Sequence, residues 1–207
     1  MSTVINSELL NIWKTKNARL AAFTDSEYMP LLLSAYRELD VSALFRSRTH
    51  GQGHIERTML LGALLAQGEQ LSAELTRLLL LCCAYHDVGR VSDWLDRKHG
   101  ERSAEKIANG SLKEKFAGFS PEDFNIALAA ICAHSLSDKD MGLVFEHYRV
   151  PSELEERCTL LSCRLKDADN LDRVRLGDLN PKYLRCDTAK ALVDDAQWIF
   201  DNYRQCK

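Results

Sequence analysis

Apolar residues recur every three to four positions along almost the whole chain, which is the spacing of one face of an α-helix. No stretch shows the strict apolar and polar alternation that is typical of a half-buried β-strand. The pattern therefore predicts an all-α protein, a compact bundle of about nine helices with short connections. The predicted helices begin near Ser7, Ser26, Gln52, Leu71, Glu101, Pro121, Lys139, Pro151 and Asp187.

Proline and glycine mark the ends of several predicted helices. Residues 120–123 (Ser-Pro-Glu-Asp) and 150–153 (Val-Pro-Ser-Glu) place proline in a first turn and acids near the positive end of the helix dipole. Breaks are predicted at residues 109–111 and 180–181. No repeat or linker is visible, so residues 1–207 are expected to form a single domain.

Composition narrows the class of protein. The chain is 45% hydrophobic, which is enough for one compact core, and its formal net charge of −3 argues against a duplex nucleic-acid partner. The longest apolar run is about half of a membrane span, and the first residues do not resemble a signal peptide. The seven cysteines include no C-x-x-C pair and are expected to be buried, reduced thiols, which suits a cytoplasmic protein.

One stretch joins an apolar helix directly to ionisable residues. Residues 78–85 are an unbroken apolar run that ends at His86 and Asp87, and Gly89 and Arg90 follow. A carboxylate at the end of a buried segment needs a partner, because burying it unpaired costs roughly several kcal/mol. A metal ion would be such a partner, and Gly89 is expected to end the helix there.

Three other predicted helices also end an apolar stripe with a group that can bind a metal, namely His54, His134 and Asp169. Taken singly, each histidine is better explained as a cap or a core residue, and Asp169 is explained equally well by an ion pair. Taken together, one nitrogen-and-oxygen metal site explains all of them. The helical period turns Asp167 away from the side of Asp169, about 200° around the helix.

This order of residues resembles the HD-domain superfamily of metal-dependent phosphohydrolases. Residues 54–58 (HIERT) look like the family's first-histidine helix, residues 86–90 (HDVGR) like its central His-Asp motif, and residues 167–172 (DADNLD) like its closing Ala-Asp motif. The resemblance covers a motif core of about residues 50–175. It implies a first divalent ion held by His54, His86, Asp87 and Asp169.

Two further histidines, His99 and His134, look like the additional ligands of the family's binuclear branch. In that branch Asp87 would bridge two ions, since a carboxylate can offer one oxygen to each. The alternative for His99 is an exposed loop residue. A ligand set of imidazoles and carboxylates suits Mn²⁺, Fe²⁺, Mg²⁺ or Ni²⁺, and Zn²⁺ also fits, so one or two such ions are expected.

The resemblance implies a phosphoric ester hydrolase in which a metal-bound hydroxide attacks the phosphate ester of a nucleotide or similar small molecule. The predicted catalytic residues are Asp87, Arg90 and His134. The predicted substrate contacts are His50, Arg90, Arg102 and Arg173. Further candidates for phosphate contact are Lys98, Arg175, Lys182 and Arg185. Each can also be an ordinary surface charge, which is the favoured explanation for Lys182 and Arg185. Residues expected to orient the site are Arg57, Asp93 and Asp172.

Other functions fit the same residues. One alternative is a di-iron oxygenase of the superfamily's inositol-oxygenase-like branch, and another is a helical domain that keeps a metal for stability or senses a nucleotide. A metal-free bundle with incidental core histidines is the remaining alternative. His147 is expected to be structural. Leucines at positions 31–33 fit either a core or a dimer face, so the oligomeric state stays open.

Overall fold

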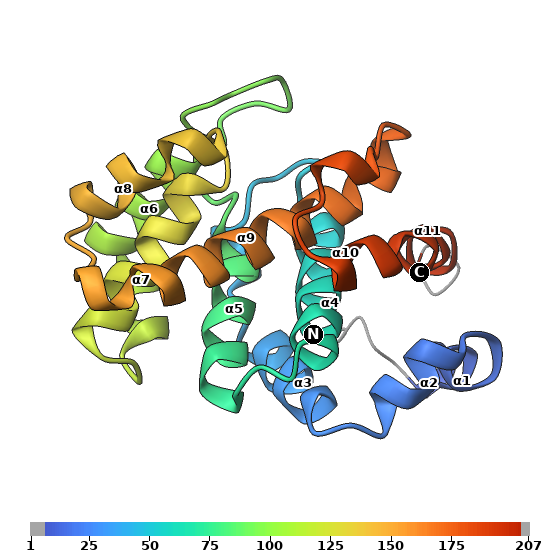
Figure 1. Ribbon diagram of the computed structural model, residues 1–207. Coiled ribbons are helices and arrows are strands. Elements are labelled where there is room, and N and C mark those ends of the chain that lie inside the picture. The colour runs from blue at the N-terminus through green and yellow to red at the C-terminus, as the bar shows by residue number, and fades with distance from the viewer. Residues whose placement is uncertain (1–6, 204–207) are drawn as a thin grey trace.

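The computed structural model describes residues 7–203, and within them the chain forms helices and no strand (Figure 1). The all-α prediction is confirmed. The α-helices are α1 (Ser7–Lys16), α2 (Ala18–Thr24), α3 (Tyr28–Glu38), α4 (Gln52–Gly68), α5 (Ala73–Tyr85), α6 (His99–Asn109), α7 (Pro121–Ala133), α8 (Met141–His147), α9 (Glu155–Leu171), α10 (Asp187–Ala191) and α11 (Val193–Tyr203). Short 3-10 helices fill several of the connections.

The predicted helix starts lie within a few residues of the observed ones. The first and the last predicted helices are each divided into two helices in the structure. The first predicted helix breaks at Asn17, whose side chain accepts a hydrogen bond from Leu20 N and caps α2. The last breaks between α10 and α11, at Leu192. Ser120 caps α7 by accepting from Asp123 N, as expected of a polar residue before a proline.

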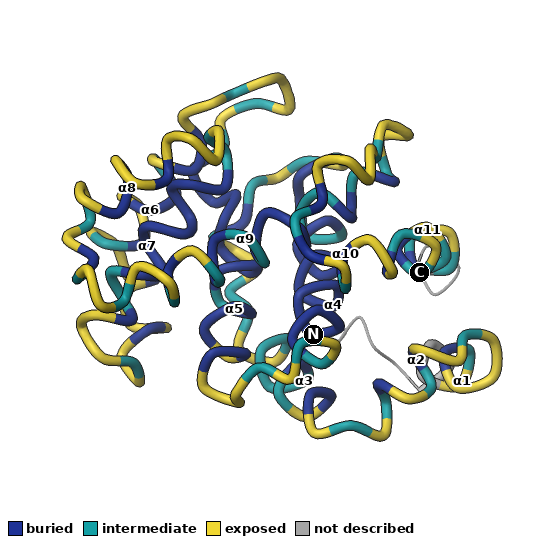
Figure 2. The backbone as a smooth tube through the Cα atoms, viewed as in Figure 1, coloured by how far each residue is buried: buried dark blue, intermediate teal, exposed yellow. Residues whose placement is uncertain are grey.

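Helices α4, α5, α7 and α9 form the centre of the bundle, with α4 against α5 and α9, and α7 against α5 and α9. Thirteen of the 17 residues of α4 are buried, because α3, α5 and α9 all pack on it. Figure 2 shows this central group as the most deeply buried part of the chain. Leu32 of α3 is fully buried, and Leu31 and Leu33 are partly buried against the same core.

The cysteines are free thiols throughout the part of the chain that the structure describes. Five of these six are buried, and Cys163 is partly exposed. Cys206 lies outside the described residues. Between residues 7 and 203, no helix combines the length and the apolar character that crossing a membrane would require.

Candidate metal centre

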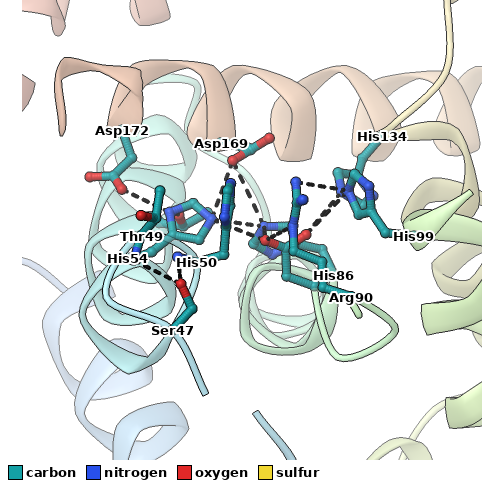
Figure 3. Close-up of polar contacts among 12 residues, drawn as sticks. Ser47, Thr49, His50, His54, His86, Arg90, His99, His134, Asp169 and Asp172 are labelled. Carbon is teal, nitrogen blue, oxygen red and sulfur yellow. Dashed lines mark hydrogen bonds and ion pairs between the residues drawn. The ribbon is translucent and has the colours of Figure 1, made fainter. Parts of the chain in front are cut away.

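Six side chains from five helix ends converge beneath α9 (Figure 3). His54 lies in the first turn of α4, His86 and Asp87 directly follow α5, and His99 begins α6. His134 follows α7, and Asp169 lies in the last turn of α9. All are buried except Asp169, whose side chain is 27% exposed. The structure thus brings together every residue that the sequence suggests as a metal ligand.

Four of these residues face one point. His54 Nε2 lies 3.2 Å from His86 Nε2 and 3.3 Å from Asp169 Oδ1, while His86 Nε2 lies 3.8 Å from that same oxygen. Asp87 Oδ2 lies 3.7 Å from His54 Nε2 and 3.8 Å from His86 Nε2. Ligands bound to one ion at about 2.0–2.2 Å lie about 3.0–3.5 Å apart. The four atoms are therefore spaced for a single divalent ion after a small contraction.

A second group shares Asp87. His99 Nε2 lies 2.8 Å from His134 Nε2, and Asp87 Oδ1 lies 3.2 Å and 3.7 Å from these two nitrogens. Asp87 Oδ1 is buried without a hydrogen-bond partner. The two oxygens of this carboxylate thus face two different pairs of imidazoles, which is the arrangement that a bridge between two ions needs.

The tautomers of the four histidines explain why a cation fits here. Three of them donate a hydrogen bond from Nδ1 to a backbone carbonyl three residues earlier: His86 to Cys83 at 2.9 Å, His134 to Ile131 at 2.5 Å, and His99 to Asp96. A carbonyl only accepts, so Nδ1 carries the proton and Nε2 carries a lone pair. Lone pairs from neighbouring imidazoles then point at one another, which is unfavourable until a cation lies between them.

The protonation states of the cluster also favour a bound cation. Burial lowers the pKa of His54 and of His134 to about 4, so both are neutral at pH 7. Burial alone would raise the pKa of Asp87, but the positive charge that His86, His134 or His99 would place beside it when protonated lowers that pKa well below its usual range. Neutral imidazoles around ionised carboxylates are the donor set of a divalent metal site.

His54 is oriented by a buried carboxylate. Asp172 Oδ2 accepts a hydrogen bond from His54 Nδ1 at 2.7 Å. The same carboxylate accepts hydrogen bonds from Arg57 Nε at 2.6 Å and Arg57 Nη2 at 2.9 Å. Arg175 Nη1 also donates to it, at 3.2 Å. The structure thus gives Arg57 and Asp172 the partners that an orienting role requires.

His50 lies at the edge of the cluster. Its ring meets that of His54 edge-on at 5.9 Å between centroids, and its Nδ1 lies 2.9 Å from Asp93 Oδ1. Ser47 also binds Asp93, so the segment before α4 and the α5–α6 connection are joined here (Figure 3). His50 is buried although it precedes the helix that carries His54.

The basic residues predicted to contact substrate fall in different places. Arg90 Nε donates to Asp87 Oδ2 at 2.7 Å, directly at the cluster. Arg102 binds Asp96 and the carbonyl of Gly89. Arg173 pairs with the exposed Asp178. Substrate contact by Arg102 or Arg173 stays a prediction, and both side chains already have acidic partners.

Two of the further candidates for phosphate contact have partners in the fold, and one of them lies near the cluster. Arg175 donates from Nε to the carbonyl of Thr49, beside His50, and so lies nearer the cluster than Arg173 does. Arg185 pairs with Asp138 and Asp167. Asp167 is turned away from the cluster as the helical period predicts, yet it is fully buried, because the backbone N–H of Arg185 donates to it.

Two glycines that make the second group possible were not recognised as such from the sequence. A Cβ on Gly100 would lie 2.7 Å from the carbonyl oxygens of Ile131 and Cys132, so α6 can approach the end of α7 only through a glycine. Gly89 was expected to end α5, but that helix ends earlier, at Tyr85, and Gly89 has no left-handed backbone. A Cβ there would lie 2.3 Å from Ser103 N, so its role is close packing against α6.

A protein-family model described as the HD domain matches residues 52–174, which is more than half of the chain. The matched range contains all six residues of the cluster, together with Arg57 and Asp172. His50 and Arg175 lie just outside it. Searches of curated protein sequences and of solved structures gave no significant match.

Proposed function

Because the chain belongs to the HD-domain family, we propose that it is a metal-dependent hydrolase of phosphoric esters whose substrate is a nucleotide or similar small molecule. The family is of the metal-dependent hydrolase type, and the His/Asp cluster is compatible with a divalent metal site. The observation that supports the proposal most strongly is the shared Asp87, with one oxygen toward each pair of imidazoles.

In this proposal the first ion is held by His54, His86, Asp87 and Asp169, and the second by Asp87, His99 and His134. Ions so placed lower the pKa of bound water and neutralise phosphoryl oxygens. Mn²⁺, Fe²⁺, Mg²⁺ and Ni²⁺ suit this donor set, and Zn²⁺ also fits. The exposed edge of Asp169 marks the side on which the cluster meets solvent.

Arg90 and His50 are the side chains best placed to meet the substrate. The Arg90 guanidinium spans from Asp87 Oδ2 toward His99, with Nη2 3.5 Å from His99 Nε2. It therefore offers N–H donors to a phosphoryl oxygen at the cluster. Asp93 holds Nδ1 of His50, which leaves Nε2 of that ring for a substrate oxygen.

The test combines metal analysis with turnover. The protein, purified without chelators or a nickel column, is expected to carry about two ions per chain and to hydrolyse phosphate monoesters or diesters. Asp87→Ala removes the oxygens shared by both groups, and we expect loss of metal and of turnover. Asp178→Ala changes an exposed carboxylate outside the cluster and serves as the matched control.

Three outcomes would contradict the proposal. Oxygen consumption with an iron-dependent visible band, without ester hydrolysis, would indicate the di-iron oxygenase. Metal retained without any turnover on a broad panel of phosphate esters would indicate a structural or sensing domain. Unchanged turnover in Asp87→Ala would show that the cluster is not the active site.

A further inference from the structure

Residues 90–98, here called the rim loop, connect the two halves of the metal cluster. The loop begins at Arg90, which contacts Asp87, and it leads directly into His99. It projects from the body of the molecule (Figure 1), and most of its residues are exposed (Figure 2). Nothing in the proposed chemistry requires a projecting loop at this place.

Two acids of the rim loop bind side chains at the site or next to it. Asp93, whose side chain is 47% exposed, contacts His50 and Ser47 on the segment before α4. Asp96 turns inward to Arg102, and its backbone carbonyl accepts from His99 Nδ1. Both tethers thus reach a histidine of the site or its immediate neighbour. Only two residues lie between them, so that pair is presented at a defined place beside the cluster.

These two residues are Trp94 and Leu95, and they point outward. Trp94 is 83% exposed and Leu95 is 90% exposed, and with Val91 they are the most exposed large hydrophobic residues of the described chain. Side chains so exposed contribute little to the stability of the fold. Both acids of the loop are paired, whereas the exposed Arg97 and Lys98 follow the apolar pair.

We propose that Trp94 and Leu95 bind the aromatic part of the substrate, the nucleobase, while its phosphate lies at the metal cluster. This inference rests on the proposed function and adds to it the part of the substrate that is recognised. An indole stacks on any nucleobase, because every base has a π-face. Trp94 directly follows Asp93 in the sequence, and the carboxylate of Asp93 contacts His50 at the edge of the cluster. The charges of Arg97 and Lys98 favour an anionic ligand.

The first experiment measures binding without turnover. Trp94 is the exposed tryptophan, since Trp13 is 2% exposed and Trp198 is partly buried. Acrylamide quenching of the metal-loaded protein therefore reports mainly on Trp94. We expect at least one nucleoside 5′-monophosphate, from a panel with adenine, guanine, cytosine and uracil, to protect the fluorescence. Glycerol 2-phosphate should give no protection, and Trp94→Ala should remove the protected signal.

The second experiment measures selectivity. For Trp94→Ala we expect the ratio of kcat/KM for the best nucleotide to that for glycerol 2-phosphate to fall about ten- to hundredfold, through KM, as expected for loss of base stacking. Tyr183→Ala is the matched control, because Tyr183 is 69% exposed and lies in the 3-10 helix Pro181–Tyr183, outside the rim loop. It should leave the ratio unchanged.

The outcomes separate this inference from the proposed function. Hydrolysis of esters with neither protection nor a changed ratio overturns the role of Trp94 alone. Nucleotide protection without hydrolysis of any ester supports the role of Trp94 and contradicts the hydrolase. If Trp94→Ala instead abolishes sedimentation with anionic phospholipid vesicles, or converts a dimer into a monomer, with the selectivity unchanged, the rim loop serves another partner and the inference is wrong.

Discussion

Replacing Asp172 by asparagine tests whether the buried carboxylate tunes the metal site. The change keeps the shape of the side chain and removes its charge. Asp172 Oδ2 receives donors from His54, Arg57 and Arg175, so the amide oxygen is expected on this side. The amide NH₂ group then takes the place of Oδ1 and faces Arg57 Nε, which lies 2.6 Å from that oxygen. Two donors now meet where a donor met an acceptor.

The substitution is expected to lower both the folding free energy and the metal affinity, and each loss can be estimated. Leaving a buried donor such as Arg57 Nε without its acceptor costs about 1–3 kcal/mol of folding free energy. His54 keeps a hydrogen bond but loses a charged partner, which weakens it as a ligand. Changes of this kind lower metal affinity about 10- to 100-fold, or about 1.4–2.7 kcal/mol. Because His54 is the member of the ligand set that contacts Asp172, the loss should fall on the ion held with His86 and Asp169.

The assay is a competition titration with a chromophoric chelator, in which we expect two binding steps for the parent protein. In Asp172→Asn we expect one step to weaken by the stated factor and the other to remain. Urea unfolding of the metal-free proteins measures the stability term separately. Two unchanged affinities would refute the orienting role of Asp172, and equal loss at both steps would show that the effect passes through the whole fold. Asp178→Asn is the charge-matched surface control.

Other predictions follow from the same geometry. Gly100→Ala would force α6 away from the carbonyls at the end of α7. Because metal–ligand distances can deviate by only about 0.2 Å from their usual values, elemental analysis should show loss of one of two ions. After metal removal, the pKa values of His54 and His134 lie near 4 in the folded chain and near 6.5 in the unfolded chain, so the unfolded chain binds more protons between these values. Unfolding of the chelated protein should therefore need less urea as the pH falls from 6.5 toward 4, and constant stability would contradict this reasoning. Burial raises the pKa of Cys132 to about 11 and that of Cys158 to about 12, so peptide mapping at pH 8 should find both thiols unlabelled until the chain unfolds.

The helices and the inward direction of His54 and Asp169 could be predicted from the sequence because both are periodic signals, whereas the first ligand set as a whole came from the resemblance to the HD-domain superfamily. An apolar stripe that ends in His54 or Asp169 fixes the direction of that side chain whatever the neighbouring helices do. The prediction that Asp169 rather than Asp167 faces the cluster is therefore a statement about one helix. It needs no knowledge of how α9 packs.

The rest of the site depends on distances between helices, which no local pattern encodes. Gly100 looks like any glycine near a helix start, and its function is visible only once α7 lies against it. Arg173 and Arg175 are two residues apart and equally basic, yet one pairs with Asp178 at the surface and the other reaches Asp172 and Thr49. The contact between His50 and Asp93 spans 43 residues and joins two irregular segments, where periodicity carries no information.

Because the ligands come from helix ends that are far apart in the sequence, an ion at this site would also join distant parts of the chain. An ion held by His54 and Asp169 would close a loop of about 115 residues, and closing a loop of that length costs about 4 kcal/mol of chain entropy. The six ligands come from five helix ends, so an ion can bind with full affinity only after those ends have met. Metal supply would then act on the amount of folded protein as well as on its activity, because chains without the ion open more often and are more readily degraded.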